Sequence, residues 1–205
     1  MSTADSSRAL RPPSDRLLRT MAAVPVSSPV LLLGSPAGQH AHPLLRLGFP
    51  VHACDPRPAA VEASRHHVAD LLGEKEAANC VRTAELPALD YPDDAFDWVI
   101  IYRAEVWGDD ADTFRALLDE ARRLLKPGGW CYVTVPAQPI DTEAETRSSG
   151  DGAPEPDPDD APLFSMAHLE AQRAAVDLAE AEAPTLVREH DGPRVHAIYR
   201  RVERR

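Results

Sequence analysis

Residues 30–38 read Val-Leu-Leu-Leu-Gly-Ser-Pro-Ala-Gly, an apolar run that ends in a glycine-containing turn. An uninterrupted apolar run of this kind predicts a parallel strand that is buried on both faces. The turn from Gly34 to Gly38 lets the backbone approach a ligand closely, and the helix after it offers unpaired N–H groups. A plain tight connection between a strand and a helix explains this stretch equally well.

Strand and helix patterns alternate on both sides of this stretch. Strands are predicted at 30–33, 51–55, 80–82, 98–102 and 130–135, and helices at 15–22, 38–47, 58–73 and 112–125. The helix at 112–125 has the clearest pattern, with apolar residues recurring at i, i+3, i+4 and i+7. Strands and helices that alternate on short connections predict a doubly wound α/β fold, a parallel sheet with helices on both faces.

The C-terminal part of the chain adds a different pattern. A helix is predicted at 165–181, followed by two β-like runs at 185–190 and 194–202. Asp191-Gly192 between these runs is a hairpin turn signal. The expected sheet is therefore seven-stranded and mostly parallel, with an antiparallel hairpin at its C-terminal end.

Composition bounds the domain organisation. The chain has 205 residues and is 43% hydrophobic, which fits one domain over residues 14–205. Residues 1–13 are rich in Ser, Arg and Pro and are predicted to be disordered. Residues 137–162 are acidic and proline-rich and are predicted to form a mobile insert. The insert is interpreted either as a solvated linker or as an element that covers a substrate.

Charge and cysteine usage exclude several classes of partner. The net charge of −11 argues against nucleic acid and against anionic membranes. No stretch of 18 apolar residues and no signal peptide is present, so a cytoplasmic protein is expected. Cys54, Cys80 and Cys131 lie far apart in apolar runs without metal-ligand spacing. They are predicted to be buried free thiols, and no metal is expected.

The second predicted strand ends in Asp55, roughly twenty residues after the glycine turn. A carboxylate at this place can accept hydrogen bonds from both hydroxyls of a ribose, as in many nucleotide-binding sheets. A lone Asp at a strand end is usually only a helix cap, but its spacing from Gly34 favours the functional interpretation.

Four segments together resemble the class I S-adenosylmethionine-dependent methyltransferases, in particular type 11-like methyltransferase domains. They are residues 30–38, 53–58 (Ala-Cys-Asp-Pro-Arg-Pro), 96–100 (Phe-Asp-Trp-Val-Ile) and 124–129 (Leu-Leu-Lys-Pro-Gly-Gly). The resemblance covers about residues 30–136, and the C-terminal helix and hairpin match that family's closing strands. It implies S-adenosylmethionine as cofactor.

The resemblance also implies roles for individual residues. Gly34, Ser35 and Gly38 match the turn that holds the methionine part of the cofactor, and Asp55 matches the ribose-binding carboxylate. The other matched positions are Arg57 over the adenine, Glu85 on the adenine amino group, the Leu86 amide on the ring, and Tyr102 with Arg103 at the sulfonium end.

Two positions depart from the family pattern. Leu32 stands where an acidic residue is usual, and Pro36 replaces the central glycine of the turn. Proline removes an N–H and fixes φ near −65°. Both departures predict weaker cofactor binding than in a family member with an intact turn.

The reaction itself asks little of the protein, because the cofactor carries the electrophilic methyl group and the protein orients the reactants. A general base is needed only for an acceptor that is protonated at neutral pH. The candidates are Glu105, His40 and His42, although each is more simply interpreted as a surface residue. The expected acceptor is a small molecule that the sequence does not identify.

Two other functions stay open at this point. A methyltransferase-like domain that has lost catalysis and acts in binding or regulation is compatible with Leu32 and Pro36. A nicotinamide-dependent dehydrogenase is disfavoured by the Pro-Gly-Gly turn at 127–129 and by the terminal hairpin.

Overall fold

The computed structural model describes residues 12–34, 38–137 and 166–202. The predicted disordered N-terminus, residues 1–13, and the predicted insert, residues 137–162, therefore lie almost entirely outside the described residues. Pro12 is described, and its carbonyl oxygen accepts a hydrogen bond of 2.6 Å from Gln39 Nε2.

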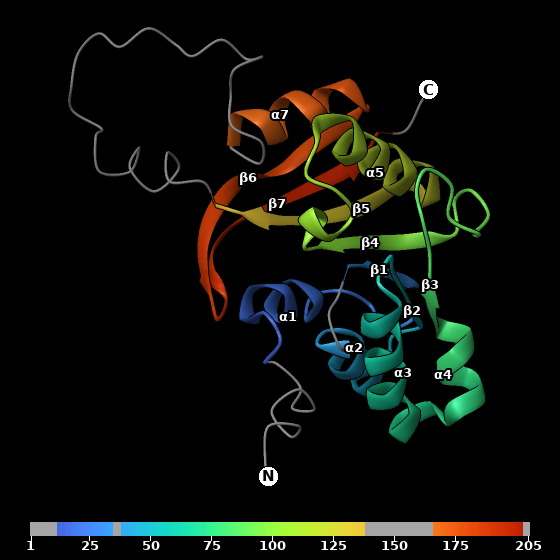
Figure 1. Cartoon of the computed structure of the whole chain (residues 1–205). Helices are drawn as coiled ribbons and strands as arrows, with labels where there is room; N and C mark the ends of the chain where they lie inside the picture. The colour runs from blue at the N-terminus through green and yellow to red at the C-terminus, as the bar shows by residue number, and fades with distance from the viewer. Residues whose placement is uncertain (1–11, 35–37, 138–165, 203–205) are drawn as a thin grey trace, which may run out of the picture.

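Seven strands form one sheet in the order β3-β2-β1-β4-β5-β7-β6 (Figure 1). All neighbours are parallel except the pairs that involve β7. This confirms the predicted mostly parallel sheet with a C-terminal antiparallel hairpin. In chain order the elements are α1 (Asp15–Met21), β1 (Val30–Leu33), α2 (Ala41–Leu47), β2 (Val51–Asp55), α3 (Pro58–Leu72), α4 (Glu74–Cys80), β3 (Val81–Thr83), β4 (Phe96–Tyr102), the 3-10 helix η2 (Ala104–Val106), α5 (Ala111–Leu124), β5 (Leu125–Pro136), α7 (Met166–Ala175), β6 (Leu178–Glu189) and β7 (Gly192–Arg201).

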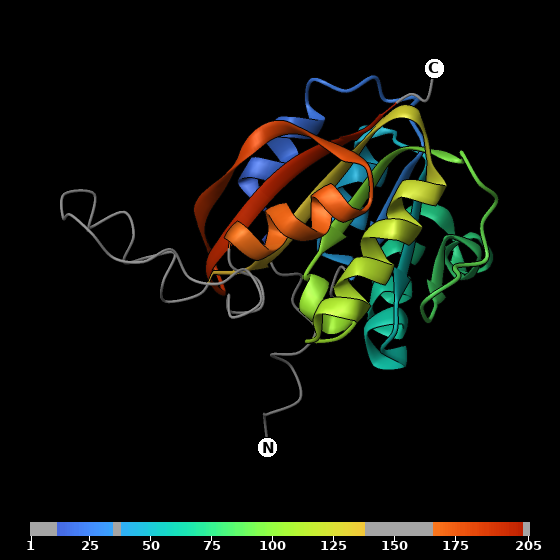
Figure 2. The same ribbon diagram turned by 90° about the horizontal axis from the view of Figure 1, so that it is seen from above.

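Helices cover both faces of the sheet. Helices α1, α2 and α3 pack on one face, and α5 and α7 lie side by side on the other, as Figure 2 shows from above. Because side chains alternate along each strand, Leu31 and Leu33 enter the core under α5 and α7, whereas Leu32 enters the core under α1 to α3. The apolar run at 30–33 is thus buried on both sides, as a central parallel strand requires.

Helix ends follow recognisable local chemistry. The Ser14 side chain accepts from the Leu17 N–H at the start of α1, and Asp110 caps α5 through the Thr113 N–H at 2.8 Å. Pro58 opens α3 at its first turn, where the missing N–H costs nothing.

Several segments differ from the sequence prediction. Residues 74–80 form an additional helix, α4, directly after Gly73. The predicted helix at 165–181 ends at Ala175, because Asp177 adopts a positive φ of 56° and the chain then enters β6. The alanine- and glutamate-rich start of β6 has helical propensity, but pairing with β7 overrides it.

The fifth strand is also longer than predicted, since it begins at Leu125 rather than at residue 130. Gly128 and Gly129 lie inside this strand rather than between a helix and a strand. They coincide with an irregularity in the pairing with β4, which shifts register between Phe96 and Trp98.

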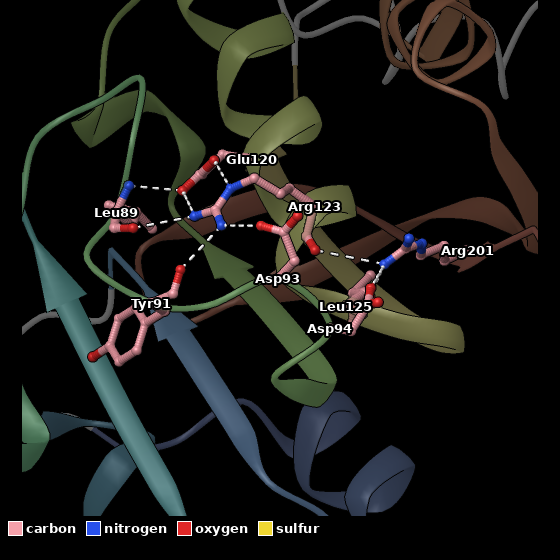
Figure 3. Close-up of polar contacts among 8 residues, drawn as sticks. All are labelled: Leu89, Tyr91, Asp93, Asp94, Glu120, Arg123, Leu125 and Arg201. Carbon is pink, nitrogen blue, oxygen red and sulfur yellow. Dashed lines mark hydrogen bonds and ion pairs between the residues drawn. The ribbon is translucent and has the colours of Figure 1, made fainter.

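A polar network fixes the loop between β3 and β4 to helix α5 (Figure 3). Glu120 is buried and accepts from the Leu89 N–H at 2.7 Å. Arg123 bonds both oxygens of Glu120 at 2.8 and 2.6 Å, the carbonyls of Leu89 and Tyr91, and Asp93 at 2.5 Å. The loop that carries residues 84–86 is therefore held by a closed set of hydrogen bonds.

Candidate functional site

Gly34 occupies the carboxyl end of β1 with a φ of 77°. Its N–H donates to the Cys54 carbonyl at 2.9 Å, so this donor is used within the sheet. A Cβ at this position would lie 2.6 Å from the Tyr102 carbonyl oxygen and 3.0 Å from Val106 Cγ2. Glycine is therefore required here both for the backbone conformation and for the close approach of the loop after β4.

The far side of the turn reaches helix α3. Gly38 has a φ of 71°, and its N–H donates to Ser64 Oγ at 2.8 Å. Ser35 and Pro36, which are predicted to take part in the turn, lie outside the described residues. Leu32, the other departure from the family pattern, is fully buried between Ala53 and Ile100 of the neighbouring strands.

Asp55 lies at the end of β2, next to this turn, and is only 3% exposed. It binds Arg57 twice over: Oδ1 accepts from the Arg57 N–H at 2.9 Å and from Nε at 2.8 Å, and Oδ2 accepts from Nη2 at 2.7 Å. The hydrogen bond to Asp55 is the main reason why the pKa of Arg57 is raised. Two residues that were predicted to contact a cofactor thus contact each other.

The segment predicted to face an adenine runs beside Asp55. The Ala84 N–H donates to the Asp55 carbonyl at 3.3 Å, which extends the pairing of β3 with β2. The Glu85 side chain is exposed, and Leu86 is half-buried against the core. The structure therefore brings Gly34, Asp55 and the segment 84–86 together at the carboxyl ends of the parallel strands.

Tyr102, which the resemblance places at the sulfonium end of the cofactor, is the last residue of β4. Its side chain is 1% exposed, and its ring lies 4.0 Å from the ring of His40 between centroids. Burial is the main cause that raises the pKa of Tyr102. Its backbone carbonyl, rather than its side chain, lines the turn at Gly34.

A group of charged side chains lies at the carboxyl end of β4 and the amino end of β7, and the sequence did not predict it. Arg103 follows β4 with a positive φ of 67°, its N–H donates to Thr134 Oγ1 at 3.1 Å, and its guanidinium bonds Asp191. Arg194 Nη2 bonds both oxygens of Glu105 at 3.0 and 2.9 Å. The sequence did not identify Arg194 and Asp191 as candidate site residues. The alternation of Arg194, His196 and Ile198 on one face of a strand could have indicated buried polar side chains there.

Two buried histidines lie behind this charged group. His40 Nε2 accepts from the Ser14 N–H at 3.1 Å, and burial lowers the pKa of His40 to about 3. His196 is also fully buried, with Nδ1 2.6 Å from Tyr132 Oη and Nε2 3.3 Å from Glu189 Oε1. Burial, followed by the charges of nearby arginines, lowers the pKa of His196 to about 3. Both imidazoles are neutral near pH 7.

These placements change the list of candidate bases. The interpretation of His40 as a surface residue is wrong, because it is fully buried and neutral. His42 is half-buried on the first turn of α2. Glu105 is half-buried and held by Arg194, so of the three it alone lies in the charged group at the carboxyl ends of the strands.

Other features lie away from this edge. Cys54 and Cys131 are buried and Cys80 is half-buried, all three as free thiols. Within the described ranges, no helix is long and apolar enough to cross a membrane, and no group of three metal-ligating side chains is found. A cavity of about 580 Å³, lined by Trp98, Lys126 and Trp130 among others, lies at the opposite, amino ends of β4 and β5.

Comparison with known proteins agrees with this architecture. A family model described as a methyltransferase domain matches residues 31–133. No match was found among curated proteins. A methyltransferase from Methanosarcina mazei, described as S-adenosylmethionine-dependent, aligns with a TM-score of 0.67 at 13% identity, covering 94% of this chain and 100% of its own.

Two further solved structures have the same fold. The N-methyltransferase NodS from Bradyrhizobium japonicum, solved with S-adenosylhomocysteine, aligns with a TM-score of 0.61 at 17% identity, covering 92% of this chain and 85% of its own. A structure described for the conversion of a disulfide bond into a thioacetal group during echinomycin biosynthesis gives a TM-score of 0.68 at 22% identity, covering 94% and 83%.

Proposed function

This chain belongs to the methyltransferase domain family, and from that premise we propose that it transfers a methyl group from S-adenosylmethionine to a small-molecule acceptor. The observation that carries the proposal is the buried carboxylate of Asp55 beside the turn at Gly34. The net charge of −11 supports a small acceptor over a nucleic acid.

Asp55 fits the ribose of this cofactor on one condition. An ionised carboxylate offers about four acceptor positions, and Arg57 takes three of them. The Arg57 side chain is 42% exposed and can turn into solvent. A ribose diol that displaces this side chain would still find a buried carboxylate at the end of β2.

The remaining contacts follow from the same edge of the sheet. Glu85 and the Leu86 amide would contact the adenine, since the segment 84–86 continues the strand beside Asp55. Gly34 and Gly38 would provide close approach rather than N–H donors, because both N–H groups are already bonded. When bound, the cofactor supplies an electrophilic methyl group on a sulfonium.

The loop after β4 orients the acceptor in this proposal. The carbonyl oxygens of Tyr102 and Arg103 and the Val106 side chain pack on Gly34, so this loop lies directly beside the turn that would hold the methionine part of the cofactor. Orientation of this kind contributes through proximity, which can supply roughly 7–11 kcal/mol toward a barrier.

Calorimetric titration with S-adenosylhomocysteine tests the cofactor site, with NADH as the competing ligand class. Asp55→Ala should weaken binding about 10- to 100-fold, because charge-assisted hydrogen bonds are worth about 1.5–3 kcal/mol. Asp97→Ala is the matched control, since Asp97 pairs with Lys126 at the amino end of β4. Absence of S-adenosylhomocysteine binding, or binding of NADH instead, would overturn the proposal.

Arg57→Ala separates two roles of that arginine. If Arg57 competes with the ribose for Asp55, its removal should tighten S-adenosylhomocysteine binding a few-fold, on the scale of one net hydrogen bond of about 1 kcal/mol. Weaker binding would instead assign Arg57 to the adenine, as the resemblance implies.

A further inference from the structure

Arg194 is the first arginine of β7 and reaches across the carboxyl ends of the central strands. It is 4% exposed, and its guanidinium carbon lies 5.6 Å from the centroid of the Tyr102 ring. Nη2 bonds both oxygens of Glu105 in η2, and Nη1 lies 3.9 Å from Asp191 Oδ2 in the turn before β7. Groups from two distant parts of the chain therefore hold this side chain in one orientation.

One buried donor of Arg194 is left without an acceptor. Its Nε is buried, and no hydrogen-bond partner lies within reach of it in the described chain. A buried N–H without a partner is uncommon in folded proteins and is a feature that needs an explanation. A ligand oxygen that reached this N–H would gain a hydrogen bond without displacing a protein acceptor.

The neighbouring charges indicate which kind of oxygen this would be. Asp191 shows that one carboxylate can face two guanidinium groups here, because it bonds Arg103 and lies 3.9 Å from Arg194 Nη1. Guanidinium groups present fixed forks of donors that match the two oxygens of a carboxylate. The Nε side of Arg194 is the part of that fork that Glu105 does not use.

Arg194 and the proposed cofactor residue Asp55 lie on different strands of the sheet. Asp55 ends β2, whereas Arg194 begins β7, and β1, β4 and β5 lie between these two strands. The loop after β4, which carries Glu105, packs on Gly34 and so joins the two places. A ligand at Arg194 would thus lie beside the cofactor, where a methyl acceptor has to be.

We propose that Arg194 binds a carboxylate of the methyl acceptor, and that Glu105 and Asp191 are positioning residues that hold its guanidinium. This inference rests on the proposed methyltransferase function, and it names the acceptor class as a carboxylate-bearing small molecule.

The test follows the arginine Nε–H signals of ¹⁵N-labelled protein by NMR during titration with sodium acetate at constant ionic strength. Acetamide is the neutral analogue of the same size. Acetate should shift the Arg194 Nε–H signal in a saturable manner, with a dissociation constant on the order of millimolar for so small a ligand, and acetamide should not.

Arg194→Lys keeps the positive charge but lacks the Nε–H donor, so the shifting signal should disappear in this variant. Arg200→Lys is the matched control, since Arg200 lies on the same face of β7 and stacks on Trp130 at the other end of the strand. If Arg194→Lys does not fold, Glu105→Gln assigns the signal by perturbing it. A non-saturable shift, or an equal response to acetamide, would overturn the inference.

A parallel titration with S-adenosylhomocysteine keeps the two proposals distinguishable. Failure of that ligand to bind while acetate still saturates Arg194 would remove the methyltransferase proposal and the acceptor role, and leave an anion site. Binding of S-adenosylhomocysteine without any acetate response would remove only the acceptor assignment.

Discussion

Two arginine–glutamate pairs lie at opposite ends of the central strands, and they differ in how completely their hydrogen bonds are satisfied. At the amino end of β4, Arg123 makes five hydrogen bonds through Nε, Nη1 and Nη2, to Glu120, Asp93 and two backbone carbonyls (Figure 3). At the carboxyl end, Arg194 donates hydrogen bonds to Glu105 and lies 3.9 Å from Asp191, and its buried Nε has no acceptor among the described residues.

The difference separates a structural network from a candidate binding group. A fully satisfied network around a buried carboxylate, here that of Glu120, stabilises and specifies one arrangement of the loop that leads from β3 to β4. An unsatisfied buried donor costs stability, and at Arg194 it is the observation from which we propose a ligand. The carboxyl end also contains the two neutral buried histidines, which the Arg123 network lacks.

The largest expected effect is acid destabilisation that arises at the carboxyl end. His40 and His196 have folded-state pKa values of about 3, below the ordinary 6.5, so the unfolded chain binds more protons. Above about pH 6.5 the two histidines do not lower the free energy of unfolding. As the pH falls from 6.5 toward 3, protonation of the unfolded chain lowers it progressively. From pH 7 to pH 5 we expect a loss of about 2 kcal/mol for each histidine, measured by urea unfolding. His40→Gln should show about half of this pH dependence, and an unchanged dependence would contradict the assignment.

The second prediction removes the satisfied pair at the amino end. Arg123→Ala leaves the buried Glu120 without its cation, and the two loop carbonyls lose their donor. We expect about 3 kcal/mol lower unfolding free energy, the lower end for a broken buried pair because Arg123 is 31% exposed. Arg122→Ala is the control, since its pair with the exposed Asp177 should contribute at most about 1 kcal/mol. Equal losses in both variants would refute a special role for the network.

The smallest expected effect concerns the turn that connects the two sites at the carboxyl end. Gly34→Ala combines a positive φ with a Cβ 2.6 Å from the Tyr102 carbonyl oxygen, so we expect a loss of about 1–3 kcal/mol. Gly48→Ala has a φ of 97° but no atom within 4 Å, so it reports the backbone strain alone. A thermal melt that shows the same loss for both would mean that the loop after β4 moves away from Gly34 freely.

The sequence by itself determined the architecture, because local patterns are sufficient for it. The apolar run at 30–33 and the periodic helix at 112–125 required burial on defined faces, and the Asp-Gly turn at 191–192 required a hairpin. The family resemblance likewise depended on short motifs at the ends of strands. The helix α4 and the true start of β6 were missed, since alanine- and glutamate-rich segments fit either state until their neighbours are known.

Only the tertiary structure decided the contacts at the carboxyl end of the sheet. Arg194 meets Glu105 across 89 residues of sequence, and Ser14 meets Glu189 across 175. No local pattern encodes such pairs, because they depend on strand order and on which loops close over the same edge. The same reason applies to His40. The sequence showed only that it follows the glycine turn, whereas the structure shows that it packs against Ser14 and Tyr102 and is buried as a neutral imidazole.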